Sequence, residues 1–224
     1  MKHLIGALLL SMLLTSTWAT NIQTNYIYKH LTTADGLSNS NVNCFEQDGN
    51  GFVWMGTDNG LNRYDGYEFA SYFSDAGGLC NLNSDEIVAL FCDSRNRLWV
   101  GTMLGCYLYN EHTDNFDLVV VDSTDATNCT KPIRAITEDP DGSLWIGTAG
   151  YGIVNYNPDN GDYRNYYAEI GGRQPLLNQE IFSLMFDRAG NLWLGMGVGD
   201  ISIKIKGSES FLSLADYIGL DLGT

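Results

Sequence analysis

The stretch QDGNGFVWMGT, residues 47–57, decides the fold, because the chain repeats its pattern three more times. The tryptophans of the four copies are spaced by 45, 46 and 48 residues. Each has an aspartate six residues before it and a glycine two residues after it. The marked residues are Asp48, Trp54 and Gly56; Asp93, Trp99 and Gly101; Asp139, Trp145 and Gly147; and Asp187, Trp193 and Gly195. A period in the middle forties predicts one small sheet per copy, as in the blades of a β-propeller.

Each copy divides into four strands. Apolar residues stand twelve and nine residues before each tryptophan, at Val42 and Phe45 in the first copy. Because side chains alternate along a strand, this odd spacing predicts a first strand that is buried on both faces. The second strand carries the tryptophan, and a more polar fourth strand completes the copy. The third strand ends at Tyr64, Tyr109, Tyr156 and, in the fourth copy, Ile203.

The sequence therefore predicts an all-β fold, a β-propeller of four-stranded antiparallel blades. We expect the repeat domain at 20–224, with blades at about 42–73, 87–121, 133–167 and 181–212. We interpret the four blades as an incomplete arc of a larger propeller, and a closed four-bladed ring is the alternative. The last residues, 214–224, carry no fifth copy, and we expect them to form a loop.

The N-terminus has the features of an export signal. A positive start at Lys2 precedes an apolar run of 11 residues, Leu4 to Leu14, and the small residue Ala19 follows. This pattern predicts a signal peptide at 1–19 and a periplasmic protein. The run is shorter than the ~20 apolar residues of a spanning helix. We therefore expect no transmembrane span in this chain beyond the leader.

Composition excludes further classes of function. The chain has 12 basic and 27 acidic residues, a net charge of −15, so it repels phosphate backbones and we expect no nucleic-acid partner. Its five cysteines form no CxxC pair, which argues against zinc. A disulfide between Cys80 and Cys129 is left open. The four aspartates lack the remaining ligands of a calcium loop and suit turn capping instead. We expect no metal and no cofactor.

The residues around the decisive stretch closely resemble the two-component regulator propeller repeat. The resemblance rests on DGLSNSNV at residues 35–42, on residues 47–66, and on DPDGSLWIGT at residues 139–148. It covers roughly residues 26–212. It implies the periplasmic sensor domain of a bacterial hybrid two-component protein, many of which are tied to polysaccharide use. Members of the family also have further blades, a membrane helix, and kinase and DNA-binding domains. We expect this chain to be a truncated version with four repeats that lacks the kinase and DNA-binding parts.

We therefore expect a non-catalytic extracytoplasmic sensor module that binds a ligand, and the resemblance favours a glycan. In propellers, ligands bind the loops at one edge of the blades. The segments that join the blades and the turns with the second glycine of each copy fall on one such edge. The candidates are Asn41, Asp85, Glu86, Lys131, Gln179 and Glu180 from the joins, and Asp58, Met103 and Tyr151 from the turns.

Two alternatives remain from the residues alone. One is a protein–protein interaction scaffold whose partner is a periplasmic protein instead of an oligosaccharide. The other is a secreted carbohydrate-active enzyme, which would need two carboxylates ~5–10 Å apart. Asp85, Glu86 and Glu180 could supply such a pair. No Ser/His/Asp set stands out in the sequence, so we expect no catalytic residues.

Overall fold

The computed structural model describes residues 28–74, 80–119, 131–168 and 176–221. The predicted signal peptide and Cys129 lie outside these residues, so the leader and the disulfide stay predictions. Residues 31–224 form one compact unit, distinct from residues 1–30. Among the described helices, none has the length and apolar character needed to traverse a bilayer.

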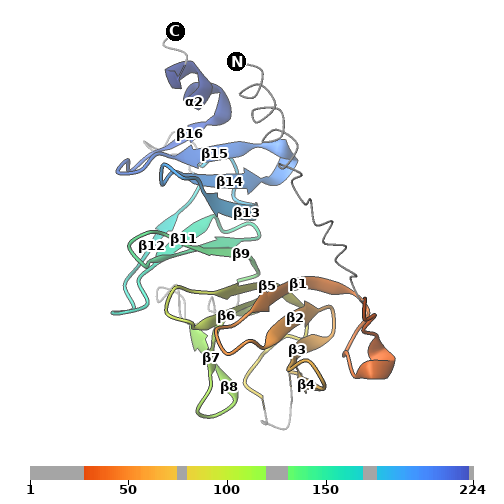
Figure 1. The fold of residues 1–224 in the computed structure, drawn as a ribbon. Coiled ribbons are helices and arrows are strands. Elements are labelled where there is room, and N and C mark those ends of the chain that lie inside the picture. The colour runs from red at the N-terminus through yellow and green to blue at the C-terminus, as the bar shows by residue number, and fades with distance from the viewer. Residues whose placement is uncertain (1–27, 75–79, 120–130, 169–175, 222–224) are drawn as a thin grey trace, which may run out of the picture. The chain divides into compact units, whose positions relative to one another are not determined.

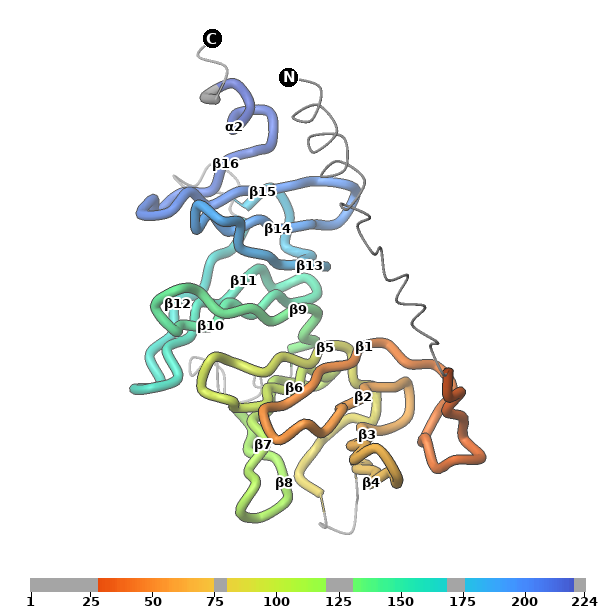
Figure 2. Tube along the Cα trace, in the orientation of Figure 1, coloured from red at the N-terminus to blue at the C-terminus, as the bar shows by residue number. Residues whose placement is uncertain are grey.

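The described strands form four separate four-stranded sheets, each an antiparallel meander in chain order. This confirms the predicted all-β fold of four blades (Figures 1 and 2). Blade 1 contains β1 (Val42–Gln47), β2 (Val53–Thr57), β3 (Gly60–Tyr64) and β4 (Phe69–Tyr72). Blade 2 contains β5 (Ile87–Cys92), β6 (Leu98–Thr102), β7 (Gly105–Asn110) and β8 (Asn115–Val119). Blade 3 contains β9 (Ile133–Glu138), β10 (Leu144–Thr148), β11 (Ile153–Tyr156) and β12 (Tyr163–Tyr166). Blade 4 contains β13 (Ile181–Phe186), β14 (Leu192–Met196), β15 (Ile201–Lys204) and β16 (Phe211–Ser213).

In the described part of the chain, three short helices accompany the blades: η1 (Thr33–Asp35), η2 (Gly197–Gly199) and α2 (Leu214–Asp221). The predicted loop over 214–224 is wrong where α2 forms. Ser213 starts this helix, because its hydroxyl accepts the backbone N–H of Asp216 at 3.1 Å and donates to the Asp216 carboxylate at 2.6 Å. The ring of Tyr217 then packs edge-on against Trp193, with the centroids 5.4 Å apart. Capping and this aromatic contact stabilise a helix that its sequence period does not reveal.

A bulge in every first strand overturns the prediction for its two apolar positions. One residue of each first strand is skipped in the pairing with the second strand. This extra residue turns the positions twelve and nine before the tryptophan to the same face. In blade 4 these positions are Ile181 and Leu184, and both reach Gly147 of blade 3. The skipped residues are Asn43, Val88, Arg134 and Phe182.

The first strands contact one another in series, β1 with β5, β5 with β9, and β9 with β13. The two strands at the ends of this series keep apolar side chains in solvent. Phe45 on β1 is 76% exposed, and Met185 on β13 is 59% exposed. The expectation that every first strand is buried on both sides therefore fails for β1 and β13. A closed ring of these four blades would cover both side chains.

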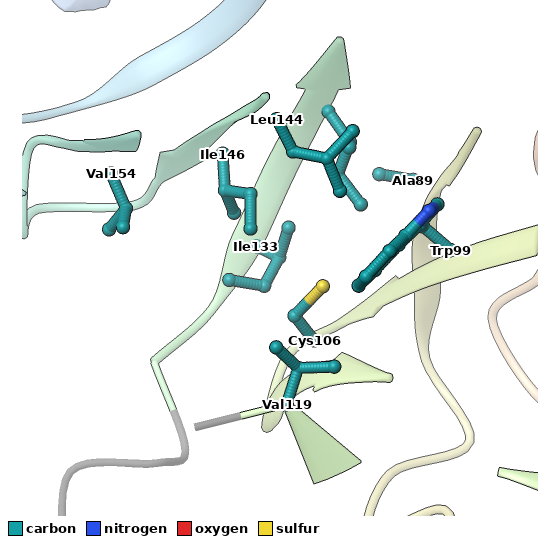
Figure 3. Packing of buried hydrophobic residues seen from close by; sticks show 9 residues of the cluster. Ala89, Trp99, Cys106, Val119, Ile133, Leu144, Ile146 and Val154 are labelled. Carbon is teal, nitrogen blue, oxygen red and sulfur yellow. The ribbon is translucent and has the colours of Figure 1, made fainter. Parts of the chain in front are cut away.

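The hydrophobic cores lie between successive blades. At the junction of blades 2 and 3, Trp99 and Cys106 of blade 2 pack against Ile133, Leu144 and Ile146 of blade 3 (Figure 3). Equivalent cores join blade 1 to blade 2 and blade 3 to blade 4. A single sheet therefore cannot bury its own apolar residues, and each blade depends on its neighbour.

In blades 1 to 3, the glycine two residues after the tryptophan is required by this packing. A Cβ at Gly101 would lie 2.7 Å from Cγ2 of Ile133, and one at Gly147 would lie 2.6 Å from Cγ2 of Ile181. Real Cβ atoms do not approach so closely. The missing side chain thus makes the space into which the next blade inserts its isoleucine.

The aspartate and tryptophan of each copy form the same contact four times. The indole N–H donates to the aspartate six residues earlier, at 2.7, 2.9, 3.2 and 2.9 Å in blades 1 to 4. The other carboxylate oxygen accepts two backbone N–H groups of its own turn, as Asp93 does from Arg95 and Arg97. The bonds to the backbone are the turn capping that the sequence predicted, and the bonds to the indoles hold the four tryptophans at the same place in each blade.

The pairing of the third strand in blade 4 corrects one assignment made from the sequence. Leu192 pairs with Lys204, whereas the equivalent Leu144 of blade 3 pairs with Tyr156. The counterpart of the third-strand tyrosine is therefore Lys204 and not Ile203. The Lys204 ammonium lies 5.5 Å from the ring centroid of Trp145, so a cation–π contact replaces the aromatic pair.

Candidate ligand-binding edge

The turns between second and third strands and the segments that join the blades lie together, and we call this the Gly-turn edge. In every blade a backbone N–H of this turn donates to the carbonyl just before the first strand, over 3.0–3.3 Å. The pairs are Asp58 to Asn41, Met103 to Glu86, Ala149 to Pro132 and Gly197 to Glu180. The predicted common edge of joins and turns is thus present, whereas the binding roles of its residues stay predictions.

Two junctions are also bonded across the blades at this edge. The N–H of Gly60 donates to the carbonyl of Asp85 at 2.7 Å. The N–H groups of Gly150 and Gly152 both donate to the carbonyl of Gln179, at 3.2 and 2.9 Å. Backbone bonds therefore hold the candidate side chains on a fixed frame.

Blade 1 contributes a polar group at this edge. The Asp58 carboxylate accepts one amide N–H from Asn41 at 2.6 Å and another from Asn43 at 2.9 Å. These two bonds lower the pKa of Asp58, and the bond from Asn41 has the larger effect. Asp85 lies at the next join, and its carboxylate accepts the backbone N–H of Ser74 at 2.5 Å.

Blade 3 contributes an aromatic side chain above a buried cation. Lys131 is 6% exposed, and its ammonium lies 5.2 Å from the ring centroid of Tyr151. Tyr151 is 44% exposed and lies between Gly150 and Gly152, whose backbone N–H groups donate to the carbonyl of Gln179. The ring therefore contacts Lys131 and is partly exposed to solvent.

Two further side chains of this edge were not among the candidates predicted from the sequence. Leu104 and Val198, like Tyr151, directly precede the second glycine of their copy in the sequence, and they are 42% and 96% exposed. Val198 has φ = 62°, a left-handed conformation that is unusual for a β-branched residue. Three of the four copies have an apolar or aromatic residue before the second glycine, but the sequence does not show that these side chains are exposed.

The carboxylates named for an enzyme do not meet in any described contact. Glu86 and Glu180 are exposed and precede the first strands of blades 2 and 4. The Asp85 carboxylate is bound to the Ser74 backbone. Within the described ranges, no three histidine, cysteine, aspartate or glutamate side chains gather as metal ligands would.

The opposite edge, formed by the aspartate turns, has two clefts between blades that the sequence did not predict. The larger, of about 280 Å³, lies between blades 1 and 2 and is lined by Asn50, Asn96, Tyr109, Glu111 and Asp117 among others. The smaller, of about 120 Å³, lies between blades 3 and 4, with Asp141 on one blade and Lys206 on the other.

Four sheets joined through interblade cores and a shared Gly-turn edge define a β-propeller repeat protein. The chain carries four two-component regulator propeller repeats. The model of that repeat family matches residues 36–59, 81–103, 129–150 and 175–197. Histidine kinase P4 from Formosa agariphila is 43% identical over 67 residues, which are 30% of this chain and 5% of that protein.

Solved structures support the fold. The extracellular domain of a hybrid two component system from B. thetaiotaomicron has a TM-score of 0.73 and 24% identity over 85% of this chain and 26% of its own. A catalytically inactive virginiamycin B lyase from Staphylococcus aureus has a TM-score of 0.59 and 15% identity over 83% of this chain and 57% of its own. The chain thus spans about a quarter of the length of that extracellular domain.

Proposed function

We propose that this chain is a non-catalytic input module of a two-component signalling protein, exported to the periplasm, and that its Gly-turn edge binds an oligosaccharide. The four regulator propeller repeats and the kinase relative support the signalling role. The proposal includes a leader at 1–19 and a repeat domain at 20–224. The mass of the protein recovered from the periplasm tests the leader, since an intact N-terminus there would contradict cleavage.

The Tyr151 ring is the observation that carries the oligosaccharide proposal. It is exposed and seated on Lys131, so little conformational entropy is lost when a flat apolar face packs on it. Exposed carboxylates and amides on the same edge, such as Glu180, Glu86 and Asn41, could bond sugar hydroxyls. An aromatic platform with polar groups beside it is typical of small-molecule sites.

Thermal-shift screening of the purified chain against neutral oligosaccharides tests this proposal. A ligand that binds only the folded state raises the melting temperature. We expect Tyr151→Ala to abolish the shift, whereas Tyr67→Ala, at an 88% exposed tyrosine of the β3–β4 turn, should leave it unchanged. A thermal shift that persists in Tyr151→Ala would show that the oligosaccharide binds at another site.

A protein partner is the second candidate, and Val198 favours it. This apolar side chain is 96% exposed in a turn with a left-handed backbone, and strained backbone of this kind clusters at ligand clamps and switch regions. A photo-crosslinker at position 198 that captures one defined periplasmic protein, with no thermal shift from any oligosaccharide, would support the scaffold over the glycan module.

A further inference from the structure

The three junctions between blades share one arrangement, in which one blade inserts a side chain (the donor half) and the other receives it (the acceptor half). The donor half is the first strand of the following blade, with isoleucine twelve residues before the tryptophan: Ile87, Ile133 or Ile181. The preceding blade supplies the glycine of its second strand, which receives that isoleucine at 2.6–2.7 Å from the missing Cβ. The preceding blade also turns its tryptophan toward the partner, as Trp54 meets Tyr109 of blade 2 at 4.8 Å between ring centroids.

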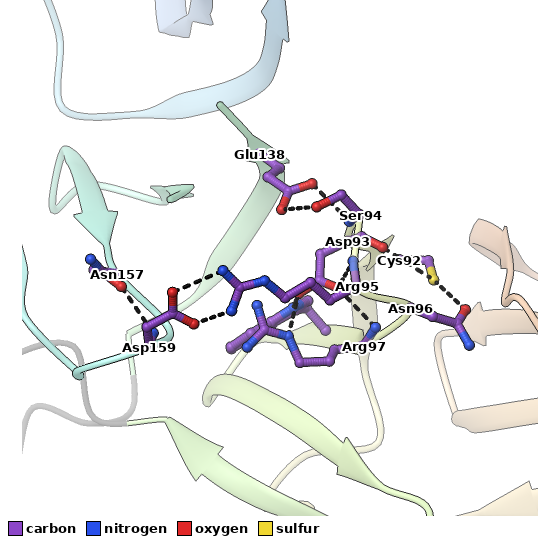
Figure 4. A network of polar contacts seen from close by, with 10 residues as sticks. Cys92, Asp93, Ser94, Arg95, Asn96, Arg97, Glu138, Asn157 and Asp159 are labelled. Atoms are coloured by element: carbon purple, nitrogen blue, oxygen red, sulfur yellow. Dashed lines mark hydrogen bonds and ion pairs between the residues drawn. The ribbon is translucent and has the colours of Figure 1, made fainter. Parts of the chain in front are cut away.

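Each junction also has an ion pair of fixed direction. The preceding blade supplies an arginine, and the following blade supplies a carboxylate from the turn between its third and fourth strands. At the middle junction Arg95 binds Asp159 through both guanidinium nitrogens, while Ser94 binds Glu138 beside it (Figure 4). The other two pairs are Arg63 with Asp114 and Arg164 with Glu209.

Blade 1 presents an unused donor half. Val42 and Phe45 stand at the positions of Ile181 and Leu184, but they are 43% and 76% exposed. The turn between β3 and β4 carries the exposed carboxylates Asp65 and Glu68, at the place of the carboxylates in the three pairs.

Blade 4 presents an unused acceptor half. A Cβ at Gly195 would meet only its own blade, at Ser183, whereas the other three glycines meet the next blade. Met185 pairs directly with Trp193, so both face the side where a following blade would lie. Phe182, the bulge residue, is 55% exposed. Arg188 is exposed in the turn between β13 and β14, as Arg95 lies in the equivalent turn of blade 2.

We propose that a second copy of this chain docks its blade 1 on blade 4 of the first. Val42 and Phe45 of one copy would pack on Gly195 and Met185 of the other. Arg188 of the acceptor would meet the acidic β3–β4 turn of the donor. The two end surfaces repeat the features of the three junctions. Apolar side chains lie opposite a glycine, and an arginine lies opposite carboxylates. The contact joins two different surfaces, so the association is head to tail.

Helix α2 competes with the docked copy. Tyr217 packs on Trp193, where the first two junctions place a third-strand tyrosine of the next blade. The contacts of α2 reach β15 and β16, and they leave Met185 of β13 exposed. Docking of Tyr64 from a second copy therefore requires α2 to give way.

Sedimentation velocity of the full chain at increasing concentration tests the proposal. We expect reversible self-association that Phe45→Asp and Met185→Asp each weaken by about tenfold or more, since a buried charge at an interface centre is costly. Leu118→Asp, on β8 and away from both ends, is the control and should associate normally. Thermal melting of each variant checks that it folds, which the exposure of both residues favours.

Mixing the two variants separates this proposal from a symmetric dimer. Phe45→Asp retains an intact blade 4, and Met185→Asp retains an intact blade 1, so their mixture should form a one-to-one complex. In a chain with both ends unmodified, Tyr217→Ala should strengthen self-association, because Tyr217 no longer packs on Trp193. A chain that stays monomeric at all concentrations, association unaffected by either charge, or a mixture that forms no complex would overturn the proposal.

Discussion

At the residue scale, the aspartate six residues before each tryptophan forms the same contact in all four blades. In blade 4, Asp187 accepts the indole N–H of Trp193 and the backbone N–H groups of Asn191 and Ala189. The bond from Trp193 is the largest cause that lowers the pKa of Asp187 from 3.8 to about 2. One carboxylate thus fixes both the turn and the ring.

The lowered pKa of Asp187 predicts a dependence of stability on pH. A carboxylate with a depressed pKa in the folded state stabilises the fold above its unfolded pKa, and this is lost as pH falls through the folded value. We therefore expect the stability difference between the wild type and Asp187→Asn to be constant above pH about 4 and to shrink toward pH about 2. Urea unfolding of both proteins across this range measures it. A difference that does not change with pH would contradict the assignment.

The glycine after the tryptophan gives a second prediction at this scale. Gly147→Ala places a methyl group against Ile181 of the next blade, so we expect a loss of about 1–3 kcal/mol in the free energy of unfolding. Gly195→Ala is the matched control. Its nearest neighbour is the small Ser183 hydroxyl, which can rotate away, so the cost should be much smaller. Equal losses in urea unfolding would show that Gly147 is not required to receive the isoleucine of the next blade.

The turn capping by the four aspartates was predictable from the sequence, whereas their bonds to the indoles and part of the candidate edge were not. Four copies in one register were enough to predict turn capping, because the same two residue types recur at one spacing. The bulge was not predictable, since Asn43, Val88, Arg134 and Phe182 share no chemical property. Leu104 and Val198 were overlooked because exposure, and not residue type, makes them notable.

At the scale of elements, the junctions differ in how deeply their ion pairs are placed. Arg63 lies 5.0, 5.5 and 5.8 Å from the ring centroids of Phe52, Trp54 and Tyr72. Asp114 accepts the hydroxyls of Tyr72 and Tyr109 at 2.7 and 2.6 Å. Burial, and next the bond to Asp114, raise the pKa of Tyr109 to about 12.

A double-mutant cycle on Arg63→Met and Asp114→Asn should therefore give a coupling energy of about 1–3 kcal/mol. The matched cycle on Arg164→Met and Glu209→Gln should give about 0.2–1 kcal/mol, because exposed pairs are screened by water. The arginine side chains are 24% and 56% exposed, respectively. Urea unfolding of the four proteins in each cycle measures both values. Coupling at the exposed pair equal to that at Arg63 would contradict this reading of the first junction.

Helix α2 shows where sequence periodicity fails for a short element. It has eight residues, and its stability comes from the Ser213 cap and from Tyr217 on Trp193. We expect Tyr217→Ala to cost about 0.5–1.5 kcal/mol, the usual value of an aromatic pair, and to shift Trp193 emission to the red. Tyr67→Ala serves as the control. Unchanged emission would mean that α2 does not shield the indole.

At the scale of the whole molecule, stability depends on neighbouring blades, because the cores lie between sheets. In such repeat arrays, the terminal units have one stabilising interface and the middle units have two. The second strands of blades 2 and 3, β6 and β10, are buried at all five positions. The first strand of blade 1 has no buried residue, and several positions of β13 are exposed.

Hydrogen exchange should therefore divide the molecule into a stable middle and two weaker ends. We expect the amides of β6 and β10 to exchange most slowly, since they open only when two interfaces are lost together. Those of β1 and β13 should exchange faster at low protein concentration. If a second copy docks on the ends, protection of β1 and β13 should rise with concentration while β6 and β10 stay unchanged. Uniform protection across all four blades at every concentration would contradict both the junction-based account of stability and the unused halves at the two ends.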